Sequence, residues 1–95
     1  MENIIIDFTD CTRLHEVHAL LKKQFDFPDY YGANPSALWD CIYPWGGDGP
    51  ATLYFYGVNA FRAQDTVSKR AMDIILDVFA DLKRNGDPVD IVVVN

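Results

Sequence analysis

Residues 68–94, SKRAMDIILDVFADLKRNGDPVDIVVV, carry the most regular pattern of the sequence and decide its fold class. In the first part, apolar residues recur three or four positions apart, which predicts an amphipathic helix from about Ser68 to Arg84. The Asn85-Gly86 pair is typical of the residues that end a helix. The run that follows, Asp90–Val94, is almost continuously apolar, as in strands of parallel sheets that helices cover on both faces. A long helix followed closely by such a strand predicts an α/β protein.

Two more short runs are predicted to be strands: Asn3–Phe8 (NIIIDF) and Ala51–Tyr56 (ATLYFY). Both are rich in β-branched or aromatic residues and lie next to turn signals. Strands that are separated by helices pair in parallel and are joined by right-handed crossovers. We therefore expect one domain over residues 1–95, built on a three-stranded parallel sheet.

Helices are predicted in the intervals between these strands. One is expected over Thr12–Phe25 with Thr12 as its N-cap, and a short one begins at the cap-and-proline pair Asn34-Pro35 and is stopped by Pro44. A third is expected over Asn59–Ala63, with the asparagine as its cap. With the long helix near the C-terminus, about four helices pack on the sheet and the expected order is β-α-α-β-α-α-β.

The charge of the sequence restricts its partners. Of 95 residues, 8 are Lys or Arg and 14 are Asp or Glu, which gives a formal net charge of −6 at pH 7. Binding to nucleic acid or to an anionic membrane needs clustered basic residues, whereas the basic residues here are scattered. The sequence has neither a basic leader followed by an apolar segment nor an 18-residue apolar span. We therefore expect a cytoplasmic protein, monomeric when free, that binds a basic protein and neither nucleic acid nor membrane.

Few residues point to reaction chemistry. Cys11 and Cys41 are far apart and have no CxxC spacing, so we expect two reduced, buried thiols. His15 and His18 lie three positions apart on a predicted helix, but the sequence marks no third metal ligand. The glycine-rich turn after Trp45 lacks the lysine and hydroxyl residue of a phosphate-binding loop. The sequence thus predicts no metal, no cofactor and no catalytic residue.

The densest aromatic cluster is Phe27–Trp45, FPDYYGANPSALWDCIYPW, with three tyrosines, two tryptophans and two acids. On the short helix predicted here, Ser36, Asp40 and Tyr43 share one side, and Trp39 lies at the boundary with the apolar side. Large aromatic side chains beside a carboxylate are typical of hot spots in protein interfaces. Alternatively, the tryptophans fill gaps over the sheet and Asp40 is an ordinary solvated residue. The residue pattern alone leaves both interpretations open.

Three segments closely resemble the barstar family, the intracellular inhibitors of barnase-type ribonucleases. They are PDYYGANPSALWDC (residues 28–41) with the following Trp45, VFADLKRNG (residues 78–86) ahead of the terminal IVVV run, and LHEVHALLKK (residues 14–23). The resemblance spans nearly the whole chain. It implies a three-stranded parallel sheet with four helices, in agreement with the order predicted above, and an inhibitor rather than an enzyme.

The resemblance also implies which residues contact a ribonuclease. Asp40 is the central one: its carboxylate would occupy the position of a scissile RNA phosphate and accept hydrogen bonds from Arg, Lys and His side chains of the enzyme. The other positions come from the matching family motif and from the same side of the short helix. The predicted partner-binding residues are Tyr30, Asn34, Ser36, Trp39, Asp40, Tyr43, Trp45 and Asp81.

The sequence departs from the family pattern in its acids. Family acids are replaced here by Ala33, Ser36 and Asn85, and the acid of the last helix is shortened to Asp81. These losses reduce the negative charge of the predicted surface and therefore put the identity of the partner in question.

Three functions follow from these observations. The leading interpretation is an immunity protein that binds a basic ribonuclease toxin one to one and blocks its active site; Asp29 and Asp48, on neighbouring loops, keep a cationic partner reasonable. An alternative is an immunity or interaction module for a different toxin or protein. The third is a small enzyme that uses Asp40 with a histidine, for which the sequence offers no supporting spacing.

Overall fold

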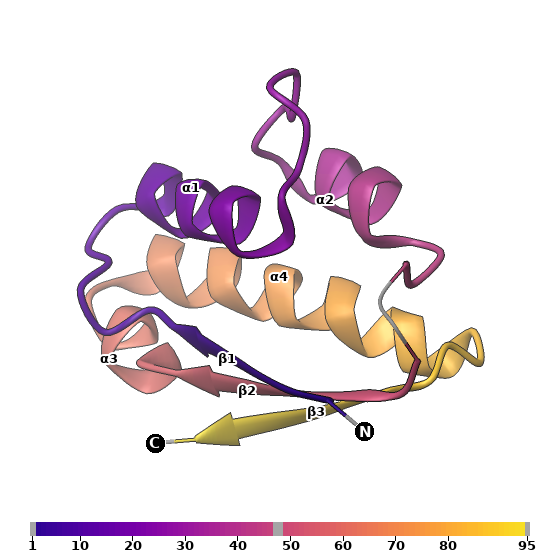
Figure 1. The fold of residues 1–95 in the computed structure, drawn as a ribbon. Helices are drawn as coiled ribbons and strands as arrows, with labels where there is room; N and C mark the ends of the chain where they lie inside the picture. The colour runs from indigo at the N-terminus through magenta and orange to yellow at the C-terminus, as the bar shows by residue number, and fades with distance from the viewer. Residues whose placement is uncertain (1, 47–48, 95) are drawn as a thin grey trace.

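Three parallel strands form one sheet in the part of the chain that the computed structural model describes, residues 2–46 and 49–94 (Figure 1). The strands are β1 (Glu2–Asp7), β2 (Ala51–Tyr56) and β3 (Val89–Val94), and β2 lies in the centre. Ile5 is paired with Tyr54, and Tyr54 with Val92. This sheet, with the element order β-α-α-β-α-α-β, confirms the fold class predicted from the sequence.

Four helices connect the strands within the described residues: α1 (Leu14–Phe25) and α2 (Pro35–Ile42) between β1 and β2, and α3 (Val58–Arg62) and α4 (Thr66–Arg84) between β2 and β3. The short α3 lies at the edge of the sheet to which the C-terminal ends of the strands point, and the long α4 runs back across the sheet (Figure 1). Asn34 is the N-cap of α2, as predicted, and Pro35 is its first residue.

The N-cap of α1 is Arg13 rather than the predicted Thr12. A carboxylate inside the helix determines this start, because Oε1 of Glu16 accepts hydrogen bonds from the backbone N–H groups of Thr12 at 3.1 Å and of Arg13 at 2.9 Å. These bonds lower the pKa of Glu16 from its ordinary value. The sequence pattern had shown the acid in the first turn but not which backbone groups it would contact.

The other two predicted helix starts are also displaced. Helix α4 begins two residues before Ser68, because the carboxylate of Asp65 caps it by accepting the Ser68 N–H at 2.7 Å. Helix α3 has Gly57 as its N-cap instead of Asn59. Gly57 has φ 76°, a left-handed conformation that glycine adopts without strain, so the chain can turn into α3 directly after β2.

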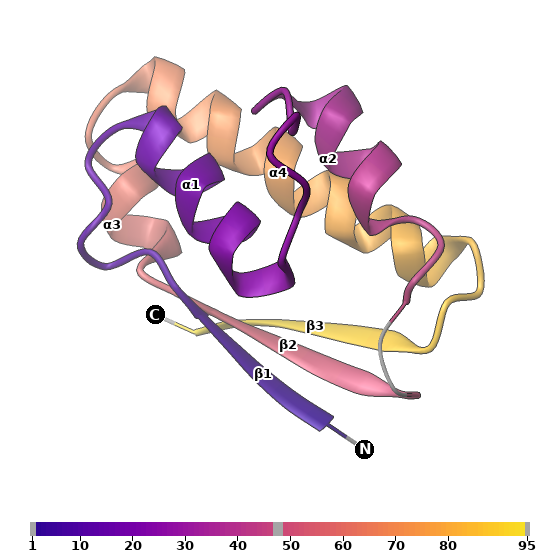
Figure 2. The ribbon, with the colours of Figure 1, turned by 45° about the horizontal axis from the view of Figure 1, so that its top comes forward.

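Helices α1, α2 and α4 lie on one side of the sheet, and no described element covers the other side (Figure 2). The prediction that the strand at Asp90–Val94 is covered on both faces is therefore wrong. Both crossovers move across the sheet in the same direction, and two right-handed crossovers of this kind place their helices on the same face. As a result Ile5 is 59% exposed and Val92 39%, although both belong to apolar runs.

The core lies between the covered face of the sheet and the helices. Phe55 of β2 is at its centre: its ring centroid is 5.1 Å from that of Phe79 of α4 and 6.0 Å from that of Phe8. All three side chains are fully buried. Alternating strand residues such as Ile6 and Leu53 belong to the same apolar cluster, whereas the residues between them lie on the side of the sheet that no described element covers.

Cys11 and Cys41 are free thiols, as predicted, but both are half-buried rather than buried. Within residues 2–46 and 49–94, no group of three or more His, Cys, Asp or Glu residues is arranged to hold a metal ion. The same residues contain no helix that is both long enough and apolar enough to cross a membrane.

Candidate functional site

The loop between α1 and α2 is held to the body of the protein by Tyr31. Its hydroxyl lies 2.6 Å from Nδ1 of His18 on α1, and its ring packs on Phe27 with 4.9 Å between centroids. Burial lowers the pKa of His18. Burial, with a smaller contribution from Cys41, raises the pKa of Tyr31 to about 12. A neutral imidazole and a neutral phenol therefore form this contact at pH 7.

Sequence reasoning missed this anchor, although a signal for it was present. His18 falls on the same side of α1 as the buried residues Val17 and Leu21, and it is itself only 3% exposed. A histidine on a buried helix face needs a polar partner. The tandem Tyr30-Tyr31 in the next loop offered one.

Asn34 fixes the start of α2. Its side-chain oxygen accepts the Ala37 N–H at 2.8 Å, and its side-chain nitrogen donates to the carbonyl of Gly32 at 3.1 Å. Both polar ends of this predicted partner-binding residue are thus engaged within the protein. Its role in the described structure is to orient the loop and the helix.

Four of the predicted residues lie on α2 or at its C-cap, which is Tyr43. Trp39 and Tyr43 lie one turn apart and stack face to face, with ring centroids 4.5 Å apart and an interplanar angle of 7°. Trp39 is half-buried against the core, whereas Tyr43 is 39% exposed. Ser36 and Asp40 are exposed and, like Tyr43, follow each other at helical spacing. We call Ser36, Trp39, Asp40 and Tyr43 the α2 surface.

Asp40 differs from the other acids near the α2 surface. Among the described residues, its carboxylate has no hydrogen-bond or ion-pair partner. In contrast, Asp29 in the preceding loop lies 3.4 Å from Nζ of Lys22, and Asp81 of α4 accepts a hydrogen bond from Nε of Arg84 at 2.8 Å. Asp48 lies outside the described residues. Of Asp29, Asp40 and Asp81, Asp40 is the one whose carboxylate is available without breaking an ion pair among the described residues.

Tyr30 and Trp45 lie on the segments that precede and follow α2. Tyr30 is 85% exposed and has none of the ring contacts that hold its neighbour Tyr31. Trp45 follows the cis peptide bond between Tyr43 and Pro44 and is held at two points. Its backbone N–H donates to the Asp87 carboxylate at 3.2 Å, and its indole Nε1 donates to the carbonyl of Gly49 at 3.1 Å.

Asp81 is the predicted residue that the structure places least favourably. Arg84, one turn further along α4, binds its carboxylate, and the same guanidinium reaches Asp77 at 3.0 Å. Asn85 donates its side-chain N–H to the Asp81 carbonyl at 2.8 Å. This acid is thus part of an ion-pair cluster at the end of α4, and a partner cation would have to compete with Arg84 for it.

The α2 surface presents groups that are common in protein-binding sites. It offers a free carboxylate, an aromatic stack and a hydroxyl group on one short helix whose start is fixed by a cap. His18, the buried histidine, is engaged with Tyr31. An arrangement with one accessible charge and flat aromatic rings suits recognition of a cationic protein surface.

Comparison with known proteins agrees with this description. The model of the family described as "Barstar (barnase inhibitor)" matches residues 1–94. A protein of Bacillus subtilis (strain 168), named "Putative ribonuclease inhibitor YrdF", is 40% identical over 81 residues, which cover 85% of each chain. A match over nearly the whole length, together with the parallel sheet and its four connecting helices, establishes that the chain belongs to the barstar family.

Proposed function

We propose that this protein is a ribonuclease inhibitor that binds a basic ribonuclease one to one and covers its active site. The observation that carries the proposal is the exposed Asp40 carboxylate, which is unpaired among the described residues and lies beside the Trp39–Tyr43 stack. Family membership and the name of the Bacillus subtilis relative support the same function. The protein acts by occupying a site, so no catalytic group is required of it.

Asp40 supplies a negative charge in place of the RNA phosphate that a ribonuclease binds. A ribonuclease active site binds the RNA phosphate through Arg, Lys and His side chains, and a carboxylate can accept the same charge-assisted hydrogen bonds. Because α2 is capped and Asp40 needs no release from an internal partner, little ordering cost precedes the contact. Trp39, Tyr43 and Tyr30 then contribute aromatic contact area around the charge.

The size of the molecule fits this mode of binding. Its accessible surface is 5739 Å², and a standard interface takes about 800 Å² from each partner, or roughly a seventh of this surface. The α2 surface with the flanking Tyr30 and Trp45 is a suitable centre for one such interface. A one-to-one complex needs no more than that.

The proposal is tested by titrating the protein into an RNA-cleavage assay with a barnase-type ribonuclease. The wild-type protein should give a sharp end point at one equivalent. Asp40→Ala should weaken binding by about 2–5 kcal/mol or more, because it leaves the cations of the enzyme buried and unpaired. That range includes measurements on the barnase–barstar pair itself.

Asp10→Ala is the matched control, because Asp10 is also exposed and without an ion-pair partner among the described residues but lies in the β1–α1 loop. It should leave the end point unchanged. Circular dichroism of both variants would show that the fold is retained. Equal inhibition by the Asp40 and Asp10 variants would contradict the role of Asp40.

A second candidate function is an immunity or interaction module for a protein other than a barnase-type ribonuclease. It is favoured by the loss of negative charge at positions where the family has acids. Ala33, Ser36 and Asn85 are uncharged, and the remaining acid, Asp81, is paired with Arg84. Failure of the folded wild-type protein to inhibit any barnase-type enzyme in the same assay would select this function.

A further inference from the structure

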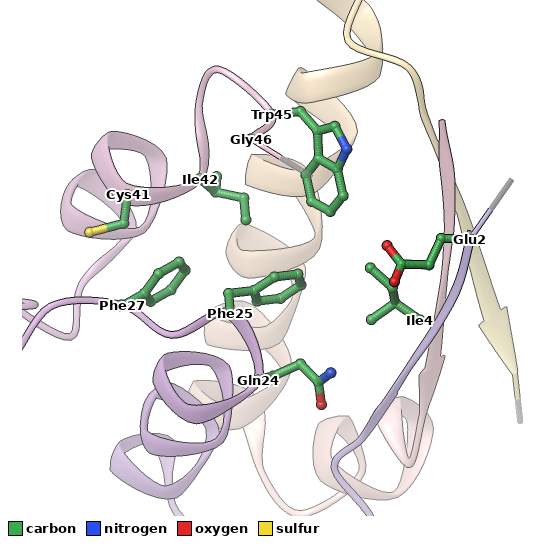
Figure 3. Close-up of a pocket in the computed structure, with 9 residues that line it drawn as sticks. All are labelled: Glu2, Ile4, Gln24, Phe25, Phe27, Cys41, Ile42, Trp45 and Gly46. Carbon is green, nitrogen blue, oxygen red and sulfur yellow. The ribbon is translucent and has the colours of Figure 1, made fainter. Parts of the chain in front are cut away.

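A cavity opens between β1, the end of α1 and the segment after α2 (Figure 3). Its volume of about 360 Å³ is within the range of small-ligand sites. Phe25, Trp45 and Ile4 are among the apolar residues that line it, and Glu2 and Gln24 bring polar groups to it. Figure 3 shows the Glu2 carboxylate turned from β1 toward the space between the Trp45 and Phe25 rings.

The two aromatic rings are arranged at right angles. Phe25 and Trp45 have an interplanar angle of 80° and ring centroids 6.2 Å apart. Other contacts hold both rings in place. The ring centroids of Phe25 and Phe79 are 5.8 Å apart, and the Trp45 indole N–H donates to the Gly49 carbonyl. The rings are therefore prepositioned, and a ligand does not have to order them.

The polar groups of the cavity have unused bonding capacity. Among the described residues, neither the Glu2 carboxylate nor the Gln24 amide has a hydrogen-bond or ion-pair partner. The residues that line the cavity include no Lys, Arg or His, so an anionic ligand would meet only a like charge. A wholly apolar ligand would make no use of this exposed carboxylate and amide. The lining instead suits an organic cation with an apolar stem, which can contact aromatic rings and a carboxylate together.

We propose that this cavity receives the guanidinium or ammonium group of an Arg or Lys side chain of the bound protein partner. The head group lies at Glu2 and Gln24, and the aliphatic stem lies against Phe25 and Ile4. The assignment to a protein side chain rests on the proposed function. It is supported by position, because Cys41 and Ile42 at the end of α2 line the cavity together with Trp45, which is itself one of the predicted partner-binding residues. The net charge of −6 favours a basic partner as well.

The first experiment examines the cavity without any ribonuclease. N-acetyl-arginine methylamide is titrated into the free protein while ¹H–¹⁵N NMR follows the Trp45 indole and the Gln24 side-chain amide. We expect saturable shifts at both, with the Gln64 side-chain amide, which lies just after α3 and donates to the Phe61 carbonyl, unchanged as an internal control. The uncharged analogue N-acetyl-citrulline methylamide should produce no saturable shift, and Glu2→Gln should weaken binding of the arginine probe about three- to fivefold. Equal binding of the two probes, or no binding of either, would overturn the proposal.

The second experiment identifies the source of the cation. Dissociation of a barnase-type ribonuclease is compared for wild type, Glu2→Gln and Asp10→Asn, since the two variants have the same net charge. We expect Glu2→Gln to dissociate about three- to fivefold faster and Asp10→Asn to behave like wild type. Equal dissociation rates for both variants would refute a side chain of the ribonuclease as the ligand.

The two experiments separate this inference from the proposed function. If the wild-type protein binds no ribonuclease, the proposed function fails and the assignment to a ribonuclease side chain fails with it. The arginine titration still decides whether the cavity recognises an organic cation, because it is read on the free protein. Saturable binding of the arginine probe in that case would support a cation site that serves another ligand.

Discussion

Tyr30 and Tyr31 are adjacent in the sequence but do different things in the structure. Tyr30 is 85% exposed and available to a partner, whereas Tyr31 packs on Phe27 and contacts His18. The second tyrosine therefore holds the loop from which the first one projects. Because this anchor contains a titratable group with a lowered pKa, the stability of the protein should depend on pH.

We expect His18 to destabilise the fold as the solution becomes mildly acidic. The pKa of His18 in the folded state is lowered by burial, so below its ordinary value of 6.5 the unfolded chain binds the proton more readily than the native protein does. The contribution of neutral His18 to stability is complete above this value and is lost as the pH falls toward the folded-state pKa. Urea unfolding at a series of pH values between about 7.5 and 5 would measure the loss.

His15 provides the control for this experiment, because it lies on the same helix and is exposed. His15→Gln should retain the dependence on pH in this range, and His18→Gln should flatten it. The lowered pKa values of Asp7, Glu16 and Asp65 act in a more acidic range, because the ordinary values of these carboxyl groups are 3.8, 4.5 and 3.8. An unchanged slope in the His18 variant would mean that another group causes the effect.

At the scale of elements, the sheet has one face packed against the helices and one face that no described element covers. Ile5 and Ile6 are neighbours on β1, and their side chains are 59% and 0% exposed. Their sequence context is nearly the same, since both lie in the run NIIIDF. The bare face of the sheet is what makes them different.

Alanine substitution of these two residues should therefore have very different effects on stability. Ile6→Ala removes buried methyl groups and leaves a cavity, which costs about 2–5 kcal/mol of the free energy of unfolding. Ile5→Ala should cost less than about 1 kcal/mol, because the side chain is mostly in water and only strand propensity is lost. Chemical denaturation of the two variants measures the difference. Similar losses would indicate that something covers the bare face in solution.

The connection from β2 to α3 depends on a glycine at a close contact. A Cβ atom on Gly57 would lie 2.5 Å from the backbone nitrogen of Thr9 and 2.8 Å from the carbonyl carbon of Phe8. Gly86, after α4, also has a positive φ of 89°, but a Cβ there would meet nothing within 4 Å. Alanine substitution at Gly86 therefore tests the effect of a positive φ on stability, and alanine substitution at Gly57 tests a positive φ together with a steric clash.

Gly86→Ala should cost about 1–2 kcal/mol of stability, the usual cost of a left-handed conformation for a residue with a Cβ. Gly57→Ala should cost about 1–3 kcal/mol more, because the backbone of Phe8 and Thr9, just after β1, must also move away. Thermal unfolding of both variants gives the comparison. Equal costs would show that the contact with Phe8 and Thr9 relaxes easily.

At the scale of the whole molecule, the excess of acidic residues should accelerate binding to a basic partner. With a formal net charge of −6, the protein attracts a cationic surface before contact. The Debye length falls from about 30 Å at 0.01 M salt to about 3 Å at 1 M, so this attraction is screened over an accessible range. Once the complex has formed, the contact between Asp40 and the partner is buried, so salt screens this contact less than it screens the long-range attraction.

We expect the association rate with a barnase-type ribonuclease to fall by about a factor of 10 or more across that range of salt, with a smaller change in the dissociation rate. Stopped-flow measurements, with tryptophan fluorescence as the signal, would separate the two rates. An association rate that does not depend on salt would indicate a largely apolar contact and argue against a basic partner.

The sequence by itself determined the fold class, the three strands and the capped start of α2. These features follow from local patterns: apolar periodicity, β-branched runs, and asparagine followed by proline at a helix start. The boundaries of β2 were predicted to the residue, since Ala51–Tyr56 is a short apolar run between turn signals. The sequence also contains motifs that resemble the barstar family, and the match to the family model confirms this resemblance.

Only the tertiary structure decided which apolar residues are buried and which acids are free. The bare face that exposes Ile5 depends on the direction of two crossovers, and the strand pattern does not contain that direction. Asp40 and Asp81 are both acids on helices, but only Asp81 has a nearby arginine, Arg84, that pairs with its carboxylate. The Tyr31–His18 contact joins residues 13 positions apart, and the cavity brings Glu2 to Trp45. Burial, pairing and cavities depend on neighbours in space, so local sequence patterns cannot fix them.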